Sequence, residues 1–167
     1  MTTPYDNNFP TGHLEVSLPG VGDGTLPRQA WSSDSAPGWS IAVAWGPVPD
    51  GTQSLLITIF DADAPVPGGF WHWVALVPAD VSALAEGASG TAMPAGAVER
   101  ANSFGVEGYV GGNPPTGTGT HRYFTAVSAL SVPVSELPAT PSTALLHAAI
   151  VPLTLARGYA TATATAE

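Results

Sequence analysis

Short apolar segments separated by glycine and proline dominate this sequence and most constrain its fold. The chain has 19 glycines and 17 prolines in 167 residues. Proline breaks helices and glycine favours turns, so helix should be scarce. Between these breaks lie runs rich in β-branched and aromatic residues, which predict strands. The predicted strands are Leu14–Leu18, Ser40–Trp45, Ser54–Phe60, Trp71–Val77 and Arg122–Leu130.

Two of these runs, Ser54–Phe60 and Trp71–Val77, are apolar almost throughout. Such runs are typical of central strands that are covered on both faces. They flank the loop Asp61–Phe70, which is rich in proline and glycine. A chain of this length fits one domain, and no repeat or linker divides it. We therefore expect one mainly β domain over residues 1–167.

Helix is predicted at two places. One turn is expected at Asp80–Ala85, with its first residue as the cap, and a longer helix is expected from Pro141 through Ile150. Pro152 should end that helix, because proline cannot continue the hydrogen-bond ladder and disfavours helical geometry in the residue before it. Beyond it, Leu153–Thr165 alternates in character, which predicts an edge strand or a frayed tail.

Charge and missing residue types exclude several functions. The chain has no cysteine and no lysine, and 13 acidic residues outnumber four arginines to give a net charge of −9. Disulfides, thiolate metal sites, thiol catalysis, lysine Schiff bases and lysine-based phosphate loops are therefore excluded. The negative charge argues against nucleic acid and against anionic membrane surfaces as partners.

No segment indicates export or a membrane span. The start, MTTPYDNNFPTG, lacks the basic and apolar regions of a signal peptide. The most apolar stretch, Ala144–Ala156, is too short to cross a bilayer and contains His147 and Pro152. We expect a soluble, cytoplasmic protein, and the sequence leaves open whether it forms a homodimer.

Polar residues interrupt the apolar strands in a first segment, DADAP at Asp61–Pro65 followed by FWHW at Phe70–Trp73. Asp61 and Asp63 share one face if the chain stays extended, and paired carboxylates shift each other's pKa. His72 stands among aromatic residues at the start of a buried strand. These three residues can form an acid–base cluster. Alternatively, the aspartates cap a turn and the histidine belongs to the core.

A second segment, GYVGGNPPTGTGTHRY, runs from Gly108 to Tyr123. Its glycines let the backbone approach a ligand and expose N–H groups to an anion, and its two prolines stiffen the loop. His121 and Tyr123 are two residues apart at the head of a strand, so they can face one pocket, with Arg122 on the other side. The alternative is an ordinary surface loop that ends in a strand.

Together these segments are similar to the motifs of one family. A D-P-D-A-P loop followed by H-W is matched by DADAP with His72-Trp73, and a G-Y-x-G-P-x-P-P-x-G-x-x-H-R-Y loop is matched by Gly108–Tyr123. The chain thus resembles the phosphatidylethanolamine-binding protein family, also called Raf kinase inhibitor-like proteins, and its bacterial branch in particular. The similarity runs from about Trp45 to Leu130.

That resemblance implies a β-sandwich-like fold with a large antiparallel sheet, a smaller sheet and a short C-terminal helix. It also implies a small preformed pocket for phosphate, phosphoethanolamine or carboxylate groups, with no cofactor and no metal. Carried over to this chain, the residues that line the pocket are Asp61, Ala64, Pro65, Trp71, His72, Gly111, Pro114, Pro115, His121 and Tyr123.

Two departures from the family motifs fall at the pocket mouth. The first motif has Ala62 in place of a proline, and the second has Gly112 in place of a proline, followed by Asn113. Both changes free the loop backbone, and the asparagine adds an amide. They affect the ligand preference more than the fold.

Two functions follow from these residues. In the first, the pocket binds a small molecule through an anionic or polar oxygen group, held by His72, His121 and Tyr123. In the second, the chain is a cofactor-free biosynthetic enzyme, a dehydratase, cyclase or isomerase acting on a polyketide-like molecule. Its catalytic acids and bases are then Asp61, Asp63, His72 and His121. A metal held by two histidines and an aspartate, and a kinase-regulatory role, are weaker interpretations.

Overall fold

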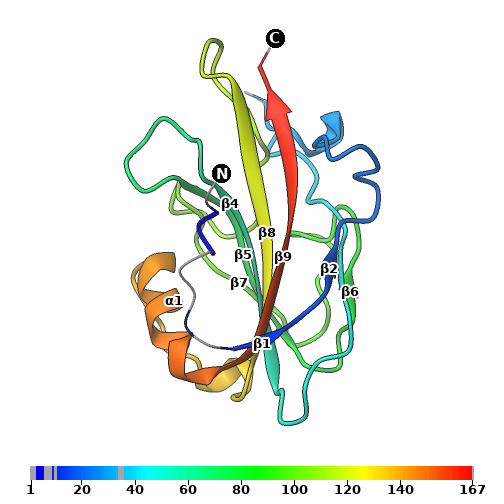
Figure 1. The fold of residues 1–167 in the computed structure, drawn as a ribbon, viewed down its shortest axis with the longest axis vertical. Helices are drawn as coiled ribbons and strands as arrows, with labels where there is room; N and C mark the ends of the chain where they lie inside the picture. The colour runs from blue at the N-terminus through cyan, green and yellow to red at the C-terminus, as the bar shows by residue number, and fades with distance from the viewer. Residues whose placement is uncertain (1–2, 6–8, 10, 34–35, 167) are drawn as a thin grey trace.

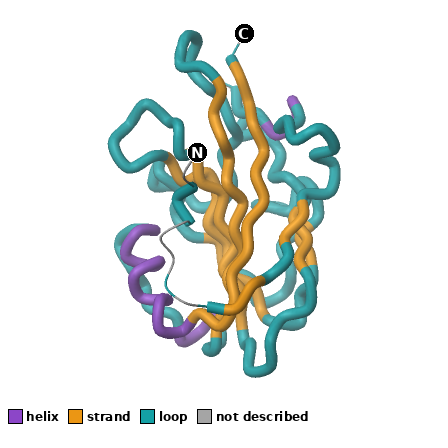
Figure 2. The backbone as a smooth tube through the Cα atoms, viewed as in Figure 1, coloured by secondary structure: helices purple, strands orange, loops and turns teal. Residues whose placement is uncertain are grey.

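The computed structural model describes residues 3–5, 9, 11–33 and 36–166. Two sheets pack face to face, and helix α1 (Thr143–Ile150) covers the outer face of the larger one (Figures 1 and 2). The strands are β1 Gly12–His13, β2 Val16–Ser17, β3 Val43–Trp45, β4 Ser54–Asp61, β5 Phe70–Pro78, β6 Ala83–Leu84, β7 Val98–Glu99, β8 Thr120–Leu130 and β9 Thr154–Thr165. Short 3-10 turns occupy Arg28–Ala30, Val134–Glu136 and Val151–Leu153. The prediction of a mainly β fold is confirmed.

The larger sheet has the strand order β1-β9-β8-β4-β5-β7. Its pairs are antiparallel except for β1 with β9, which run parallel, so the sheet is mixed where the resemblance implied an antiparallel one. The smaller, antiparallel sheet has the order β2-β3-β6. As its apolar run predicts, β4 is central and pairs with β5 and β8 over its full length.

Side chains alternate across the larger sheet and build a core on each of its faces. Leu55, Ile57 and Trp73 are fully buried between the two sheets, whereas Leu56 packs with Leu146 of α1 on the outer face. Burying such side chains contributes roughly 1.5–3 kcal/mol each. At one end of the sheet, this inner core gives way to polar side chains, and the candidate site lies there.

Helix α1 begins at Thr143, two residues after the predicted start at Pro141. The Ser142 side chain accepts a hydrogen bond from the Leu145 backbone N–H at 3.3 Å and so caps the first turn. The α-helix ends at Ile150, and Pro152 falls in the following 3-10 turn. The predicted end of this helix is therefore confirmed. The expectation that the residue before Pro152 leaves helical geometry is wrong, because Val151 keeps helical backbone angles (φ −48°, ψ −54°) and continues into the 3-10 turn.

Several segments differ from their predictions. The helical turn expected at Asp80–Ala85 is wrong, because Leu84 is buried in the core and its strand pairs with β3. The strands expected at Leu14–Leu18 and Ser40–Trp45 shorten to β2 and β3. The tail is not frayed: β9 pairs with β8 along its length, and β1 covers part of its outer edge.

Candidate functional site

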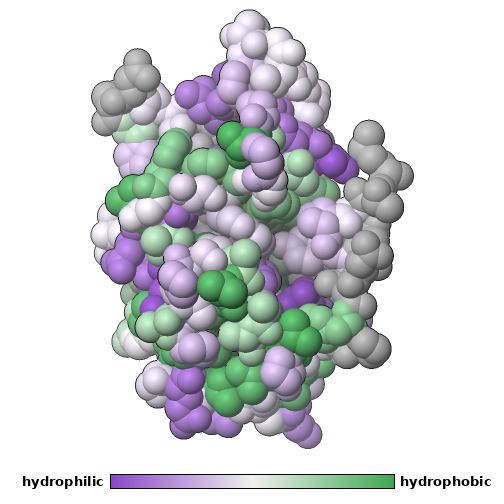
Figure 3. All heavy atoms as spheres, turned by 90° about the vertical axis from the view of Figure 1, so that its left-hand side faces the viewer, coloured by the Kyte–Doolittle hydropathy of each residue, from purple (hydrophilic) through white to green (hydrophobic). Residues whose placement is uncertain are grey.

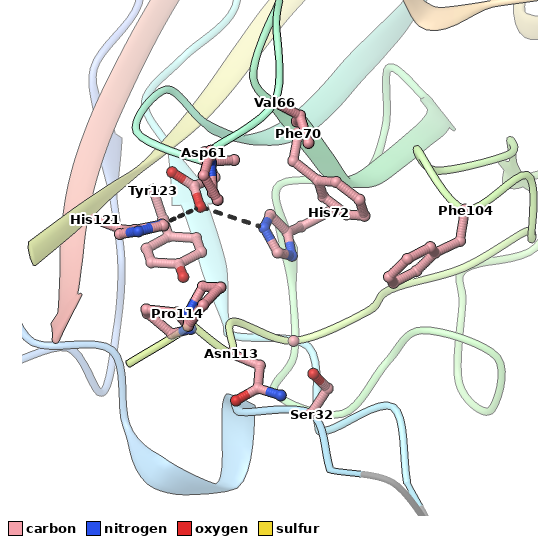
Figure 4. Close-up of a pocket in the computed structure, with 14 residues that line it drawn as sticks. Ser32, Asp61, Val66, Phe70, His72, Phe104, Asn113, Pro114, His121 and Tyr123 are labelled. Carbon is pink, nitrogen blue, oxygen red and sulfur yellow. Dashed lines mark hydrogen bonds and ion pairs between the residues drawn. The ribbon is translucent and has the colours of Figure 1, made fainter. Parts of the chain in front are cut away.

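A cavity of about 290 Å³ opens at one end of β4, β5 and β8, where loops from distant parts of the chain meet (Figure 4). Its volume is at the small end of the range for ligand pockets. The residues that line it are Ser32, Asp61, Ala64, Pro65, Val66, Phe70, His72, Phe104, Gly111, Asn113, Pro114, Pro115, His121 and Tyr123.

Strand register brings the polar residues of the cavity together. Asp61, the last residue of β4, pairs with Tyr123 of β8 on one side and with Phe70 of β5 on the other. His121 and Tyr123 are both buried, and Arg122 between them is partly exposed on the opposite side. This alternation confirms the prediction that the two residues face one pocket.

A β-bulge decides where His72 points. Ile59 pairs with Trp73 and the next residue, Phe60, pairs with Trp71, so His72 has no partner on β4. An extra residue of this kind bends a strand and redirects side chains. His72 therefore faces the cavity (Figure 4). Trp71, expected in the pocket wall, instead faces α1 and lines a separate cavity there.

Asp61 is 3% exposed, and both of its carboxylate oxygens accept hydrogen bonds. Oδ1 accepts from the Asp63 backbone N–H at 2.8 Å, and Oδ2 accepts from His121 Nδ1 at 2.7 Å. His121 Nε2 lies 2.8 Å from Thr118 Oγ1. Both ring nitrogens of His121 are therefore occupied by protein groups, and the Asp61–His121 pair forms the fixed floor of the cavity (Figure 4).

His72 is held by one nitrogen and free at the other. Its Nδ1 lies 2.7 Å from the carbonyl oxygen of Val110, which can only accept, so Nδ1 carries the hydrogen. Its Nε2 lies 4.0 Å from Asp61 Oδ2 and has no hydrogen-bond partner among the described residues, although it is buried. Burial lowers the pKa of His72, and the hydrogen bond to Val110 and the Asp61 charge oppose that shift.

Tyr123 supplies a second unpartnered group. Its hydroxyl is buried and makes no hydrogen bond to any residue that the structure describes. Burial raises the pKa of this phenol, with the Asp61 charge acting in the same direction, so it stays protonated at neutral pH. Its ring packs edge-on against the His72 ring, with centroids 5.1 Å apart.

Asp63 lies outside the cavity, although it was a candidate catalytic residue. Its carboxylate accepts hydrogen bonds from Arg122 Nε at 2.7 Å, Nη2 at 2.8 Å and the backbone N–H at 2.9 Å. The side-chain hydrogen bonds to Arg122 lower the pKa of Asp63. This bidentate pair fixes the loop after β4 to the start of β8.

The other predicted site residues do line the cavity. These are Ala64, Pro65, Gly111, Pro114 and Pro115. Five more residues line the cavity: Phe70 and Asn113, which lie within the two motif segments, and Ser32, Val66 and Phe104, which sequence reasoning missed. Ser32 reaches the cavity because its backbone N–H donates to the carbonyl of Gly112. Pairing between such distant segments leaves no signal in a single sequence.

The described residues offer no metal site. No group of three or more His, Asp or Glu side chains within them could hold a metal ion. The geometry explains this, because Nδ1 of His72 and both nitrogens of His121 are already engaged by protein atoms. The resemblance-based expectation of a cofactor-free site stays a prediction.

Comparison with known proteins identifies the family and the fold of this chain. The family model described as "Phosphatidylethanolamine-binding protein" matches residues 19–165. The chain belongs to the phosphatidylethanolamine-binding protein family. The crystal structure of Escherichia coli YbcL, described as a member of the mammalian PEBP family, superposes with a TM-score of 0.82 at 30% identity and covers 93% of this chain and 100% of that one. A PEBP homologue from Chlamydia trachomatis superposes with a TM-score of 0.77 at 25% identity, over 94% of this chain and 100% of that one.

Curated bacterial relatives of this family member align over part of their length. The E. coli UPF0098 protein YbhB is 46% identical over 93 residues, which is 54% of this chain and 58% of YbhB. LppC of Mycobacterium tuberculosis is 36% identical over 128 residues, 73% of this chain and 56% of LppC. The chain thus spans less than two thirds of these relatives. No helix in the described part of it could cross a bilayer. Because LppC carries a lipoprotein name, a cytoplasmic location stays a prediction.

Proposed function

We propose that this family member binds a small molecule by inserting an anionic or polar oxygen group into the cavity beside His72 and Tyr123. One observation carries the proposal: the His72 Nε2 and Tyr123 hydroxyl are buried, line the same cavity, and lack partners among the described residues. Leaving a buried polar group unsatisfied costs roughly 1–3 kcal/mol. An oxygen-bearing ligand that bonds to both groups would recover that cost.

The walls of the cavity restrict what can accompany the oxygen group. Phe70 and Phe104 pack edge to face, with ring centroids 4.8 Å apart, and Val66 lies beside them (Figure 4). Pro114 and Pro115, whose rings are rigid, also line the cavity. A small ligand with an apolar part next to its oxygen group fits this lining.

Calorimetric titration tests the binding function. Inorganic phosphate, phosphoethanolamine and acetate are the probes, and His72→Ala and Tyr123→Phe are the variants. Each variant should weaken binding about 10-fold or more, in line with the worth of one buried hydrogen bond to a charged group. His13→Ala is the matched control, because His13 is exposed on β1, away from the cavity. Equal, negligible heats for all three probes with the parent protein would rule the function out.

A second candidate function is acid–base catalysis in the same cavity. One observation favours it. His72 Nε2 carries no hydrogen in the neutral ring and can act as a base, and the protonated hydroxyl of Tyr123, which lines the same cavity, can act as an acid. In this proposal His72 removes a proton from a small substrate while Tyr123 stabilises the oxygen that gains charge. Asp61 and His121 position the base and acid rather than react.

Proton exchange on a simple carbon acid tests the catalytic function. Pentane-2,4-dione in D₂O is the probe, and NMR follows deuterium entering its central carbon. Exchange faster than buffer alone, lost in His72→Gln and kept in His13→Gln, supports catalysis. Exchange at the buffer rate with the parent protein counts against a proton-abstracting enzyme.

A further inference from the structure

A second cavity, of about 500 Å³, lies on the opposite face of β5 from the first one. Trp71 and His72 are neighbours on this strand, and Trp71 lines the second cavity whereas His72 lines the first. The turn that follows β7 borders both, because Phe104 lines the first cavity and Ser103 the second. The start of α1 forms another part of the wall. The volume is typical of a small-molecule pocket, so this cavity can hold a ligand of its own.

The path of the chain after β7 directs Arg100 into this second cavity. The backbone N–H of Arg100 donates to the carbonyl of Val74 at 2.8 Å, so the residue continues the pairing with β5. Glu99, one residue earlier, faces the core between the sheets, where it accepts from Trp73 Nε1 at 2.6 Å. Successive side chains of an extended chain point to opposite faces. Arg100 therefore points to the outer face and lines the second cavity.

The Arg100 guanidinium has no acceptor among the residues that the structure describes. Its Nε is buried and unpartnered, and neither Nη nitrogen makes a hydrogen bond or ion pair with them. Arg122, by contrast, donates to Asp63, and Arg157 donates to Ser128. A partly buried guanidinium loses contact with water and needs acceptors in return. The group that suits its planar fork is an oxyanion that accepts two parallel hydrogen bonds.

Glu107 is the other charged residue that lines this cavity. It pairs through a β-bridge with Ala101, the residue after Arg100, and its side chain is exposed. The two charged groups do not form an ion pair with each other, although they line one cavity. His147, which stacks on Trp71 nearby, adds no charge at neutral pH, because burial lowers its pKa to about 4. One positive and one negative group therefore remain for a ligand.

Two hydroxyls that line the cavity keep a hydrogen to donate. Ser103 Oγ accepts from the Trp71 backbone N–H at 2.8 Å, and Ser142 Oγ accepts from the Leu145 backbone N–H at 3.3 Å. Neither O–H donates to a residue in the described part of the chain. A carboxylate has about four lone-pair sites, so it can accept from such a hydroxyl as well as from a guanidinium.

We propose that this second cavity binds small molecules with a carboxylate at one end and an ammonium group at the other. The carboxylate accepts hydrogen bonds from Arg100, and the ammonium group lies beside Glu107. The carbon chain between them contacts Trp71, Val74 and Leu146, which are apolar parts of the lining. A ligand without net charge matches a cavity whose two charges cancel, whereas a dicarboxylate would bring a second negative charge towards Glu107.

Three probes isolate the two charges. γ-Aminobutyrate, butyrate and glutarate share a carboxylate on a three-carbon chain, which ends in an ammonium group, a hydrogen and a second carboxylate respectively. Nitrogen-15 NMR of the parent protein at pH 6.5 follows the Arg100 Nε–H signal, which Arg100→Lys identifies by its disappearance. γ-Aminobutyrate should shift this signal saturably, with an affinity about threefold above that of butyrate and about 10-fold above that of glutarate. The Arg122 Nε–H signal, held by Asp63, should not move.

Substitution of Arg100 tests its role in binding. Arg100→Gln should weaken γ-aminobutyrate binding about 10-fold, because the charged donor to the carboxylate is lost. Backbone amide signals of Gly105 and Ala144, which line the cavity, report binding in this variant. Arg28→Gln is the matched control and should bind like the parent, because Arg28 is exposed and lies over the Trp31 ring, outside the cavity.

Substitution of Glu107 tests the selection for an ammonium group. Glu107→Gln removes the negative charge of the cavity, so it should bind glutarate at least as tightly as γ-aminobutyrate. The proposal is overturned if no probe shifts the Arg100 signal of the parent protein at up to about 50 mM. Equal affinities for the three probes in the parent, or an unchanged order of affinities in Glu107→Gln, would overturn it too. Every readout comes from the second cavity, so the result does not depend on whether the first cavity binds a ligand.

Discussion

At the scale of single residues, the cavity depends on two glycines as well as on its polar side chains. Gly111 lies so close to the backbone of Ala30 that a Cβ there would overlap its carbonyl oxygen. Gly112, where the family motif has proline, lies against the Tyr123 hydroxyl. The two glycines let the loop approach the sheet closely enough to enclose the hydroxyl that the proposed ligand needs.

Gly112→Ala tests this close approach. Its methyl group would lie 2.8 Å from the Tyr123 hydroxyl oxygen and 2.9 Å from Leu26 Cδ2, so one of them must move. We expect overpacking to cost about 1–3 kcal/mol of stability in urea unfolding, and phosphate affinity to fall about 10-fold. Gly22→Ala is the control, because a methyl group there meets nothing within 4 Å. Unchanged phosphate affinity in Gly112→Ala would refute the role given to this glycine.

Asp63→Asn tests whether the Asp63–Arg122 pair acts on stability alone or also on ligand binding. Because Asp63 bonds to Arg122 outside the cavity, the variant should keep phosphate affinity within about twofold of the parent. Arg122 lowers the Asp63 pKa, so the pair stabilises the fold above the ordinary aspartate pKa and loses this effect as pH falls through the lower folded value. Thermal unfolding should show the variant less stable at pH 7, by up to about 1 kcal/mol, and nearly equal to the parent near pH 2. A large loss of phosphate affinity would show that Asp63 does take part in ligand binding.

At the scale of elements, the bulge in β5 controls the chemistry of the site. A regular strand would alternate Trp71, His72 and Trp73 across the sheet, and the histidine would leave the face on which Asp61 lies. The extra residue of β5, which lies opposite Ile59 and Phe60 of β4, removes that conflict. It also moves Trp71 to the outer face, against His147 of α1, with ring centroids 4.8 Å apart.

Strand β5 shows how much of this site the sequence can predict and where that prediction stops. The long apolar runs predict β4, β5 and β8, and period-two spacing correctly places His121 and Tyr123 on one face. The bulge is invisible in the sequence, because it depends on how two strands pair, and so Trp71 was assigned to the wrong side of the sheet. Phe104 was missed for a related reason: its turn approaches the cavity only in three dimensions.

His147 of α1 makes the stability of the fold depend on pH in the acid range. Burial, with a smaller effect of Arg157, lowers the His147 pKa to about 4, from an ordinary value near 6.5 in the unfolded chain. The unfolded chain therefore binds more protons between these values, and stability falls as pH drops from about 6.5 to 4. His147→Gln should remove roughly 2 kcal/mol of that loss, measured as urea unfolding free energy at pH 7 and pH 4.5. His13→Gln, on the exposed strand β1, should keep the loss of the parent. An identical loss in His147→Gln would contradict the assignment.

At the scale of the whole molecule, charged residues are few and most of them are negative. The net charge of −9 is carried by a chain in which only 10% of residues are charged. On the side of the molecule that bears α1, apolar groups are interspersed with polar ones (Figure 3). Mutual repulsion of the carboxylates opposes the compact state, because folding brings them closer together.

Salt should therefore stabilise the protein. Raising NaCl from 10 to 200 mM shortens the screening length from about 30 Å to below 10 Å, which weakens repulsion across the surface. We expect the thermal midpoint at pH 7.5 to rise by a few degrees. At pH 4, where many carboxylates are neutral, the same salt should raise it much less. A midpoint that does not change with NaCl at pH 7.5 would show that repulsion has no measurable effect on this fold.

Strand β9 is the last strand of the described chain to be synthesised, yet β8 and β1 both pair with it. Until residues 154–165 leave the ribosome, the long strand β8 has one edge of unpaired N–H and C=O groups, and β1 has no strand to join (Figure 1). An open edge of this kind pairs readily with other chains. Nascent chains of this protein are thus most prone to aggregate just before that strand is complete, and a chaperone that shields β8 would have its greatest effect there.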